Sequence, residues 1–437
     1  MQLRLPFHLA LVALAACASY AEGQANLQKE DARAIQRVLK ARDTTLDWFQ
    51  VVAKKPIDSA DSVMLVEAAP TELRPGASQP SPVVSRTQIA LLVASGARNQ
   101  VRLMLDSLPL RDLSATPQLD QPTERSVNLH FYSDYGIYLG SIKYFYDLAG
   151  RQPPAKIRYG ILALTSSTKV HGTLRYTASF GTASQVQEGW SARHAMITIQ
   201  PGAGESPAQY KIVDVPAPEE NGYAEPTPLQ AGGGESVLID NQTPPGQLHH
   251  PSSIDVIGKS GRKQQFPPPV PSMNFYRKML PGKQPPAEMW SDIGPFVLNS
   301  GKIWFASTFY DGEGVSGVGA IGTFDLAARK YQMRYLPEIA GWSGSAIRLD
   351  GDQLWIGLVH HPEGADFGGG LLGYNIKTGS ATMYAFRDVI NTIDRLGDAL
   401  YCGTSDGVYV LRDRKLIQLR FEPNEQGKLI MVTREVR

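Results

Sequence analysis

The segment that decides the fold is Gln353-Leu354-Trp355-Ile356-Gly357-Leu358, which follows the turn Asp350-Gly351-Asp352. It recurs as Lys302-Ile303-Trp304-Phe305-Ala306-Ser307 and as Ala399-Leu400-Tyr401-Cys402-Gly403-Thr404. Each copy follows a short apolar strand and a glycine-containing turn, and further apolar strands come after it. The aromatic residues of the copies are 51 and 46 residues apart, which suits one four-stranded β-propeller blade per repeat. The sequence therefore predicts a mainly β protein with propeller blades, clearest in residues 293–425.

The recurring aromatic residue has a structural explanation. A single blade cannot cover both of its faces, so neighbouring blades stack and bury the side chains between them. We therefore predict that Trp304, Trp355 and Tyr401 pack between blades and do not form a recognition surface.

Two of the copies also resemble a known class of repeat. Asp350-Gly351-Asp352-Gln353-Leu354-Trp355-Ile356-Gly357 and Leu400-Tyr401-Cys402-Gly403-Thr404-Ser405-Asp406-Gly407-Val408-Tyr409 are similar to the propeller repeats in periplasmic sensor regions of two-component regulators. The resemblance implies a propeller. It does not imply signalling, because Ala306 replaces the repeat glycine in the first copy and no kinase or membrane segment follows the blades.

The N-terminal residues are expected to direct export. Arg4 precedes a short apolar run from Leu5 to Ala16, which is too short to span a bilayer and is typical of a cleaved signal. Leu14-Ala15-Ala16-Cys17 resembles a bacterial lipobox and predicts a lipid on Cys17. Ordinary cleavage after Ala18 or Ala21 is the alternative. We predict a periplasmic or outer-membrane-anchored lipoprotein, otherwise a secreted protein, with membrane contact only through that lipid.

The chain after this signal divides by pattern. Residues 1–18 form the signal and residues 19–60 a helical segment, with the helix itself expected over 27–53. Residues 61–215 are β-rich and form early blades or a β-sandwich; four of their strands are expected at 157–164, 171–180, 194–199 and 210–215. Residues 216–437 form blades, with a proline-rich insert at 267–286 that begins in an extended polyproline conformation.

Charge and cysteine content exclude some classes of function. The chain has 43 Lys plus Arg against 42 Asp plus Glu and no long basic run interleaved with aromatic residues, so nucleic acid is not an expected partner. Only Cys17 and Cys402 are present, which excludes a disulfide framework. Cys402 is predicted to be a buried structural thiol.

Candidate site residues lie between the second and third strands of successive blades, where loops emerge at one common end. These residues are Tyr310, Asp311, Glu313, His360, His361, Glu363, Asp366 and Asp406. Among them, His360, His361 and Asp366 are candidate ligands of a divalent metal. Neighbouring histidines in extended chain point in opposite directions, and no His-Glu-x-x-His motif supports the metal. No other cofactor is predicted.

Three functions remain open on the sequence alone. The first is an exported binding or scaffold protein that uses a propeller face for a protein, peptide or glycan. The second is a metal-assisted hydrolase or lactonase-like enzyme. The third is a carbohydrate-binding module within residues 61–215, where sugars would stack on Tyr132, Tyr135, Tyr138, Tyr144 and Tyr146. The sequence lacks a Gly-x-Ser-x-Gly motif and a Walker lysine, which favours a binding protein over an enzyme.

Overall fold

The fold was analysed in a computed structural model that describes residues 29–73, 79–95, 100–109, 116–132, 138–159, 162–170, 172–180, 193–200, 209–216, 228–232, 234–240, 252–282, 290–311, 314–315, 317–360 and 367–436. The chain divides into two compact units. The first unit contains the elements from α2 to β10, and the second contains those from β11 to β32. None of the helices in the described residues is long and apolar enough to span a bilayer.

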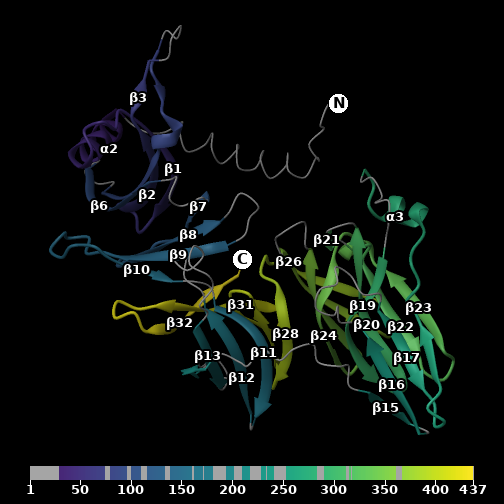
Figure 1. The fold of residues 1–437 in the computed structure, drawn as a ribbon. Coiled ribbons are helices and arrows are strands. Elements are labelled where there is room, and N and C mark those ends of the chain that lie inside the picture. The colour runs from purple at the N-terminus through teal and green to yellow at the C-terminus, as the bar shows by residue number, and fades with distance from the viewer. Residues whose placement is uncertain are drawn as a thin grey trace. The chain divides into compact units, whose positions relative to one another are not determined.

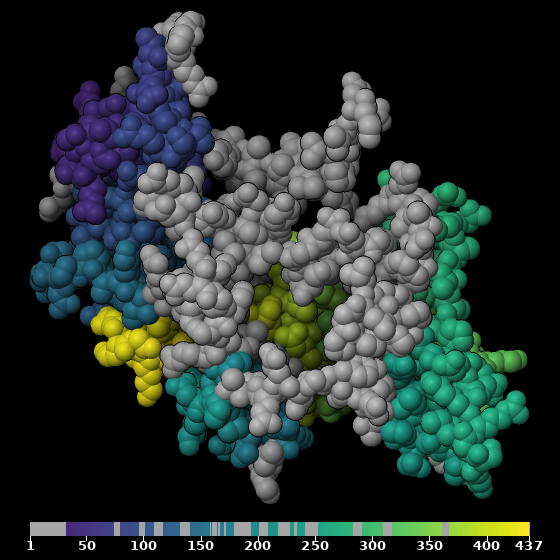
Figure 2. Space-filling model, in the orientation of Figure 1, coloured from purple at the N-terminus to yellow at the C-terminus, as the bar shows by residue number. Residues whose placement is uncertain are grey.

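The first unit begins with a helix packed on a sheet. Helix α2 (Lys29–Arg42) covers one face of the antiparallel sheet β1-β2-β5-β6 (Figure 1). The sheet strands are β1 (Trp48–Pro56), β2 (Asp61–Ala69), β5 (Gln88–Ser95) and β6 (Gln100–Pro109). Ile35 and Leu39 of the helix are fully buried against Met64 and Val66 of β2, as expected for an amphipathic helix. In Figure 2 the purple residues of α2 lie directly against blue residues of the strands.

The predicted N-terminal helix is confirmed, but the predicted extent of 27–53 is wrong beyond Arg42. The chain turns at Asp43, whose carboxylate accepts hydrogen bonds from the Thr45 amide at 2.9 Å and the Thr45 hydroxyl at 2.7 Å. It then enters β1, which pairs with β2 from Trp48 onward. Backbone pairing along a whole strand outweighs the weak helical pattern of these residues.

The second sheet of this unit packs on the other face of the first sheet. It has the order β10-β9-β8-β7, with β7 (Thr116–Leu119), β8 (Ser126–Tyr132), β9 (Tyr138–Phe145) and β10 (Ala155–Tyr159). Val63 and Leu91 of the first sheet share a core with Leu129 and Tyr144 of the second. The first sheet is thus covered by a helix on one face and a sheet on the other, so neither face is open to a further blade. A short pair, β3 (Thr71–Glu72) and β4 (Ser81–Pro82), and the 3₁₀ turn η1 (Val84–Arg86) complete the unit.

The second unit contains five antiparallel meanders. The first two are β11 (Leu162–Val170), β12 (Thr173–Phe180), β13 (Arg193–Gln200) and β14 (Gln209–Val215), then β15 (Leu229–Gly232), β16 (Glu235–Asp240), β17 (Ser253–Ile257) and β18 (Lys263–Phe266). The third is β19 (Trp290–Asn299), β20 (Lys302–Asp311), β22 (Ala320–Asp325) and β23 (Lys330–Tyr335), with β21 (Gly314–Val315) paired to β20. The 3₁₀ turn η4 (Pro337–Ile339) follows.

The last two meanders end the chain. They are β24 (Ser343–Asp350), β25 (Gln353–His360), β26 (Phe367–Asn375) and β27 (Ala381–Tyr384), then β28 (Ile390–Leu396), β29 (Ala399–Thr404), β30 (Gly407–Arg412), β31 (Lys415–Pro423) and β32 (Leu429–Glu435). The three repeats of the sequence are the second strands β20, β25 and β29. The predicted blade pattern is confirmed.

The five sheets pack face to face in a series. Separate apolar cores join β15–β18 to β19–β23, that sheet to β24–β27, and β24–β27 to β28–β32. A fourth core joins β28–β32 to the earliest sheet, β11–β14. The first strands β11, β19, β24 and β28 each carry a β-bulge at the corresponding place. The sheets share a meander topology, four of them share a bulge in the first strand, and apolar cores join one sheet to the next. These features identify them as β-propeller blades.

The packing of β11–β14 distinguishes between early blades and a β-sandwich for these strands. It also places them with the later blades, whereas the sequence analysis divided the chain after residue 215. Tyr176 of β12 and Leu164 of β11 are fully buried against Tyr401 and Leu419 of the last blade. Strands β11–β14 therefore form a blade of the second unit and not part of a sandwich. The strand predicted at 157–164 is wrong as one element, because it is divided between β10 and β11, which belong to different sheets.

The proline-rich insert contains a helix that the sequence reading missed. Helix α3 (Met273–Met279) starts after Ser272, whose hydroxyl accepts a hydrogen bond from the Phe275 amide at 3.2 Å. Tyr276 is buried against Val318 and Ala320, so the insert packs on the blade that follows it.

Candidate functional site

The described residues of the predicted site lie at the ends of second strands or in the turn after one, where the sequence predicted loops. Tyr310 and Asp311 are the last residues of β20 and pair with Val315 and Gly314 of β21. His360 is the last residue of β25, and its ring meets the edge of Trp342 at a centroid distance of 6.1 Å. Asp406 lies in the turn between β29 and β30. Glu313, His361, Glu363, Asp366 and Cys17 lie outside the described residues.

The meander topology brings further segments to the same end of the blades. In a four-stranded antiparallel meander, the turn between strands two and three emerges where the fourth strand leaves for the next blade. This end therefore also carries the connections β23–β24 and β27–β28. Backbone hydrogen bonds tie the two kinds of segment together, from the Gly341 amide to the Gly317 carbonyl at 2.6 Å and from the Ser405 amide to the Val389 carbonyl at 3.1 Å. We call it the loop end.

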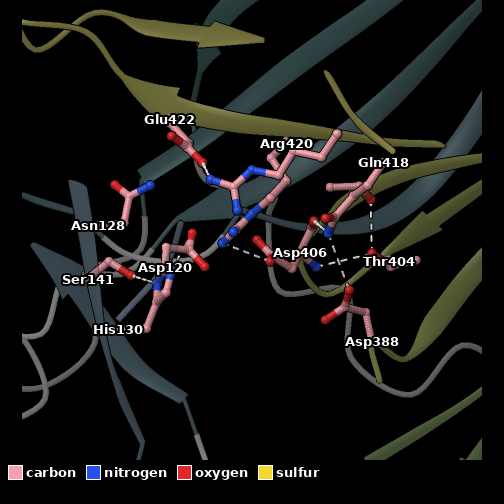
Figure 3. A network of polar contacts seen from close by, with 12 residues as sticks. Asp120, Asn128, His130, Ser141, Asp388, Thr404, Asp406, Gln418, Arg420 and Glu422 are labelled. Atoms are coloured by element: carbon pink, nitrogen blue, oxygen red, sulfur yellow. Dashed lines mark hydrogen bonds and ion pairs between the residues drawn. The ribbon is translucent and has the colours of Figure 1, made fainter. Parts of the chain in front are cut away.

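A buried polar cluster occupies the loop end of the last blade (Figure 3). Asp388, from the β27–β28 connection, accepts hydrogen bonds from the Tyr409 hydroxyl at 2.5 Å and from the Gln418 amide at 3.4 Å. The same Gln418 amide group donates to the backbone carbonyl of Asp406 at 3.2 Å. The Tyr409 ring is stacked on Phe386 with centroids 4.1 Å apart. Gln418 of β31 thus links the β27–β28 connection to the β29–β30 turn.

The second half of the cluster is ionic. Arg420 of β31 contacts the Asp406 carboxylate at 2.9 Å, and the exposed fractions of these side chains are 10% and 22%. Next to it along the strand, Glu422 accepts a hydrogen bond from Arg434 of β32 at 2.7 Å. Thr404 fixes the turn itself, because its hydroxyl accepts the Asp406 amide at 3.1 Å and donates to the Gly407 carbonyl at 3.0 Å.

Burial dominates the electrostatics of this cluster. It raises the pKa of Asp406 to about 7, although Arg420 acts to lower it, and the nearby Asp388 charge adds to the increase. Burial also raises the pKa of Asp388, against the hydrogen bond from Tyr409 and the charge of Arg420. Desolvation of a carboxylate disfavours its charged form. The cluster can therefore exchange a proton near neutral pH.

The loop end is acidic, whereas the opposite end of the same three blades is not. Between β19 and β31, the segments of the loop end carry seven acidic residues and one arginine, namely Asp311, Glu313, Glu338, Glu363, Asp366, Asp388 and Asp406 against Arg387. One of the seven, Asp406, is paired with Arg420 of β31. The turns of the opposite end carry seven basic and five acidic residues, namely Lys302, Arg329, Lys330, Lys377, Arg412, Arg414 and Lys415 against Asp325, Asp350, Asp352, Asp398 and Asp413. The insert before β19 adds Arg277, Lys278 and Lys283 against Glu288, which leaves the loop end net negative.

At the opposite end, three of the acidic residues are paired with basic residues of the same end. Lys377 lies 2.7 Å from Asp352, Arg412 lies 3.2 Å from Asp398, and Lys302 lies 3.8 Å from Asp325. Exposed pairs of this kind add little stability, but they neutralise the local field. The charge asymmetry of the blades therefore arises at the loop end.

The metal prediction is not supported by a cluster in the described part of the chain, which contains no group of three or more His, Cys, Asp or Glu side chains placed to hold an ion. Two of its three residues, His361 and Asp366, lie outside that part. The metal site therefore stays a prediction.

The first unit contains a hydroxyl–imidazole–carboxylate chain that sequence spacing did not reveal. His130 of β8 lies between two partners (Figure 3): its Nδ1 contacts the Ser141 hydroxyl, and its Nε2 lies 3.0 Å from the Asp120 carboxylate. Ser141 is the cross-strand partner of His130, so pairing of β8 with β9 sets the contact. Ser141 is 1% exposed and His130 is 4% exposed. A hydroxyl buried to this degree does not contact a substrate. We therefore infer that these three side chains hold β7, β8 and β9 together.

The burial of two tyrosines and of Cys402 bears on two further predictions. Tyr144 is fully buried and Tyr146 is 5% exposed, and both belong to the core between the two sheets. They do not stack on sugars, which removes part of the basis for a carbohydrate-binding module. Cys402 is 1% exposed in the core between the last two blades, and burial raises the pKa of its thiol. The predicted structural thiol is confirmed.

Comparison with known proteins establishes neither a family nor an activity. No family model matches the chain, and no curated protein sequence matches it. Among solved structures, it is similar to the extracellular domain of a hybrid two-component system from B. thetaiotaomicron, with 14% identity over 72% of this chain and 34% of that chain and a TM-score of 0.30. The chain thus spans about a third of that protein.

Two further matches are covered over most of their own length. The β-propeller domain of the Trilobed protease from Pyrococcus furiosus shares 9% identity over 85% of this chain and 96% of that chain, with a TM-score of 0.25. YjhT shares 10% identity over 62% of this chain and 94% of that chain, with a TM-score of 0.26. At this level of similarity, the likeness says nothing about ligand or activity.

Proposed function

We propose that this chain is an exported binding protein that uses the acidic loop end of its propeller blades to hold a basic protein or peptide segment. The observation that carries the proposal is the difference in charge between the two ends of the same three blades. Complementary charge steers association and selects partners. Loops held on a rigid sheet scaffold are a common place for binding residues. A propeller fold alone would not choose a ligand, but its charged end does.

The polar cluster of the last blade supports this assignment. Tyr409 and Gln418 hold Asp388, Thr404 and Gln418 hold the Asp406 turn, and Arg420 pairs with the Asp406 carboxylate, so the cluster holds the backbone of the loop end in place before a ligand binds. Such preorganisation increases affinity. A guanidinium or ammonium group is the ligand chemistry that carboxylates at a loop end recognise. Export rests on residues 1–18 and stays a prediction, as does the lipid; palmitate labelling of wild type against Cys17→Ser measures the latter.

Binding of a lysine- and arginine-rich peptide to the full chain tests the function. Removing four loop-end charges (Asp311→Asn, Glu313→Gln, Glu363→Gln and Asp366→Asn) should weaken affinity about 10- to 30-fold, at roughly 0.5 kcal/mol for each charge pair lost, the value typical of surface pairs. Fluorescence anisotropy at low salt measures the dissociation constant, and affinity should fall as salt is added because exposed charges are screened.

The matched control removes four carboxylates from the opposite end of the same blades (Asp325→Asn, Asp350→Asn, Asp352→Asn and Asp398→Asn). It should bind the peptide as the wild type does. Equal weakening in both variants would mean that only net charge matters. Equal binding of an acidic peptide, or no binding of the basic one at low salt, would show that the proposal is wrong.

A further inference from the structure

A polar cleft in the first unit is independent of the loop end. It has a volume of about 130 Å³ and is lined by Asp43, Thr45, Pro70, Ser85, Arg86, Thr87 and Gln88. A shallower depression that shares Asp43 and Gln88 extends it toward Arg42, Thr44 and Ser107. The walls come from the α2–β1 turn, from η1 and from β5 and β6, all of which belong to the first unit.

The negative charge of the cleft is fixed in position. The Asp43 carboxylate accepts three hydrogen bonds, two from Thr45 and one from the Gln88 amide at 3.3 Å. Gln88 in turn accepts the Ser107 hydroxyl at 2.7 Å. The Thr45 backbone and side-chain hydrogen bonds lower the pKa of Asp43. The carboxylate is therefore ionised and immobile at neutral pH.

The positive charge of the cleft is close by. Arg86 ends η1 and lines the same cleft, and its charge also acts to lower the pKa of Asp43. Arg86 is exposed and, within the described residues, has no salt bridge with Asp43 or with another carboxylate. Ser85 and Thr87, its neighbours in sequence, line the cleft as well. One wall thus offers an acceptor for an ammonium group, and the other offers donors for a carboxylate.

We propose that this cleft binds a small free α-amino acid. The ammonium group contacts Asp43, and the carboxylate contacts Arg86 and the neighbouring hydroxyls. A ligand with both charges can pair with both walls. A simple anion would be repelled by Asp43, and a simple cation would be repelled by Arg86. Glycine, alanine and serine are the simplest ligands that carry both charges.

Isothermal titration of the full chain with L-alanine and glycine tests the inference. N-acetylglycine, which lacks the ammonium group, and glycinamide, which lacks the carboxylate, are the matched ligands. We expect the free amino acids to bind and both derivatives to bind at least 10-fold more weakly. Asp43→Asn and Arg86→Gln should each weaken L-alanine binding at least 10-fold. Because Arg86 is exposed, its variant keeps the fold even if Asp43→Asn alters the α2–β1 turn.

Asp58→Asn and Arg37→Gln are the control variants and should bind as the wild type does. Asp58 accepts the Ala60 and Asp61 amides at 2.7 Å in a similar turn outside the cleft, and Arg37 is an exposed residue of α2. The inference is overturned if neither L-alanine nor glycine binds at millimolar concentration. It is equally overturned if the derivatives bind as tightly as the free amino acids, or if Arg86→Gln binds L-alanine as the wild type does.

Discussion

Ala306 replaces the repeat glycine, and the extra volume of its methyl group is accommodated by a glycine in the neighbouring blade. A Cβ atom on Gly357 would lie 2.7 Å from Cβ of Ile390, the first residue of the next blade. At the preceding interface, the residue opposite Ala306 is Gly344, whose own Cβ would lie 2.1 Å from that of Ala306. The ladder registers place Gly344 where the other blades have Ile293 and Ile390. Close-packed interfaces require such exchange of volume.

Asp406 is expected to make stability depend on pH. Its folded pKa of about 7 is above the usual value of 3.8, so its contribution to stability is fully present below about pH 4 and is lost as pH rises through 7. Asp406→Asn removes this titration. Urea denaturation at pH 4.5, 6.0 and 7.5 should show a decline with pH in the wild type that is smaller in the variant.

The comparison between pH values separates this effect from the constant cost of leaving Arg420 without the Asp406 carboxylate. Asp398→Asn is the control, since Asp398 is an exposed carboxylate of the same blade that lies 3.2 Å from Arg412. It should retain the pH dependence of the wild type. Parallel pH curves for wild type and Asp406→Asn would contradict the raised pKa.

The β29–β30 hairpin depends on a glycine at its turn. Gly407 has a φ of 101°, and a Cβ there would lie 2.4 Å from the Leu419 carbonyl oxygen of β31. Gly397, in the β28–β29 turn of the same blade, has a φ of 62° and no atom within 4 Å of an added Cβ. We expect Gly407→Ala to lower the free energy of unfolding by about 3 kcal/mol and Gly397→Ala by about 1 kcal/mol.

Chemical denaturation of the two alanine variants measures the difference. Both substitutions place a side chain in the left-handed region, so the excess for Gly407 reports the backbone contact with β31. Equal losses would mean that β31 shifts at no cost and that the turn does not restrict the loop end.

Elements with a strong local signal could be predicted, and those defined by packing could not. The second strands around Trp304, Trp355 and Tyr401 combine alternation with turn residues, and all three are confirmed as strands at blade interfaces. The β10–β11 break occurs within an apolar run and is set by which sheet each half joins. Helix α3 lies within a proline-rich insert, and its signal was the Ser272 cap followed by Tyr276.

The two units are expected to unfold separately. Leu39 of α2 is 1% exposed in the core of the first unit, and Tyr176 is fully buried between β11–β14 and the last blade. Leu39→Ala should cost about 3 kcal/mol and Tyr176→Ala about 4 kcal/mol, because each leaves a cavity. Hydrogen exchange measured on peptides should show faster exchange in β1–β6 for the first variant and in β11–β14 and β28–β31 for the second.

Tyr176→Phe is the control at the same interface. It keeps the ring and removes a buried hydroxyl for which the described residues provide no hydrogen-bond partner, so it should not destabilise the blade pair. Faster exchange in both units after either alanine substitution would show that the chain unfolds as one cooperative body.

The candidate site was predictable only in part. Asp406 follows directly from the repeat, because a turn after a second strand has a known position in a meander. Asp388 lies in a connection between blades, and Arg420 lies in a fourth strand, so no motif spacing links them to Asp406. His130 and Ser141 meet through the β8–β9 register, which a sequence without a short turn between the strands does not fix.

The blade could be predicted from the sequence, because strand alternation, turns and a repeated aromatic residue act over a few residues and need no distant partner. The sequence also determined the charge that each loop carries. The folded chain was needed to show which blade packs on the last one, to which unit β11–β14 belong and which carboxylates are buried together. These are non-local choices, made by the fit of apolar faces and by desolvation, and both depend on what lies opposite a residue in space.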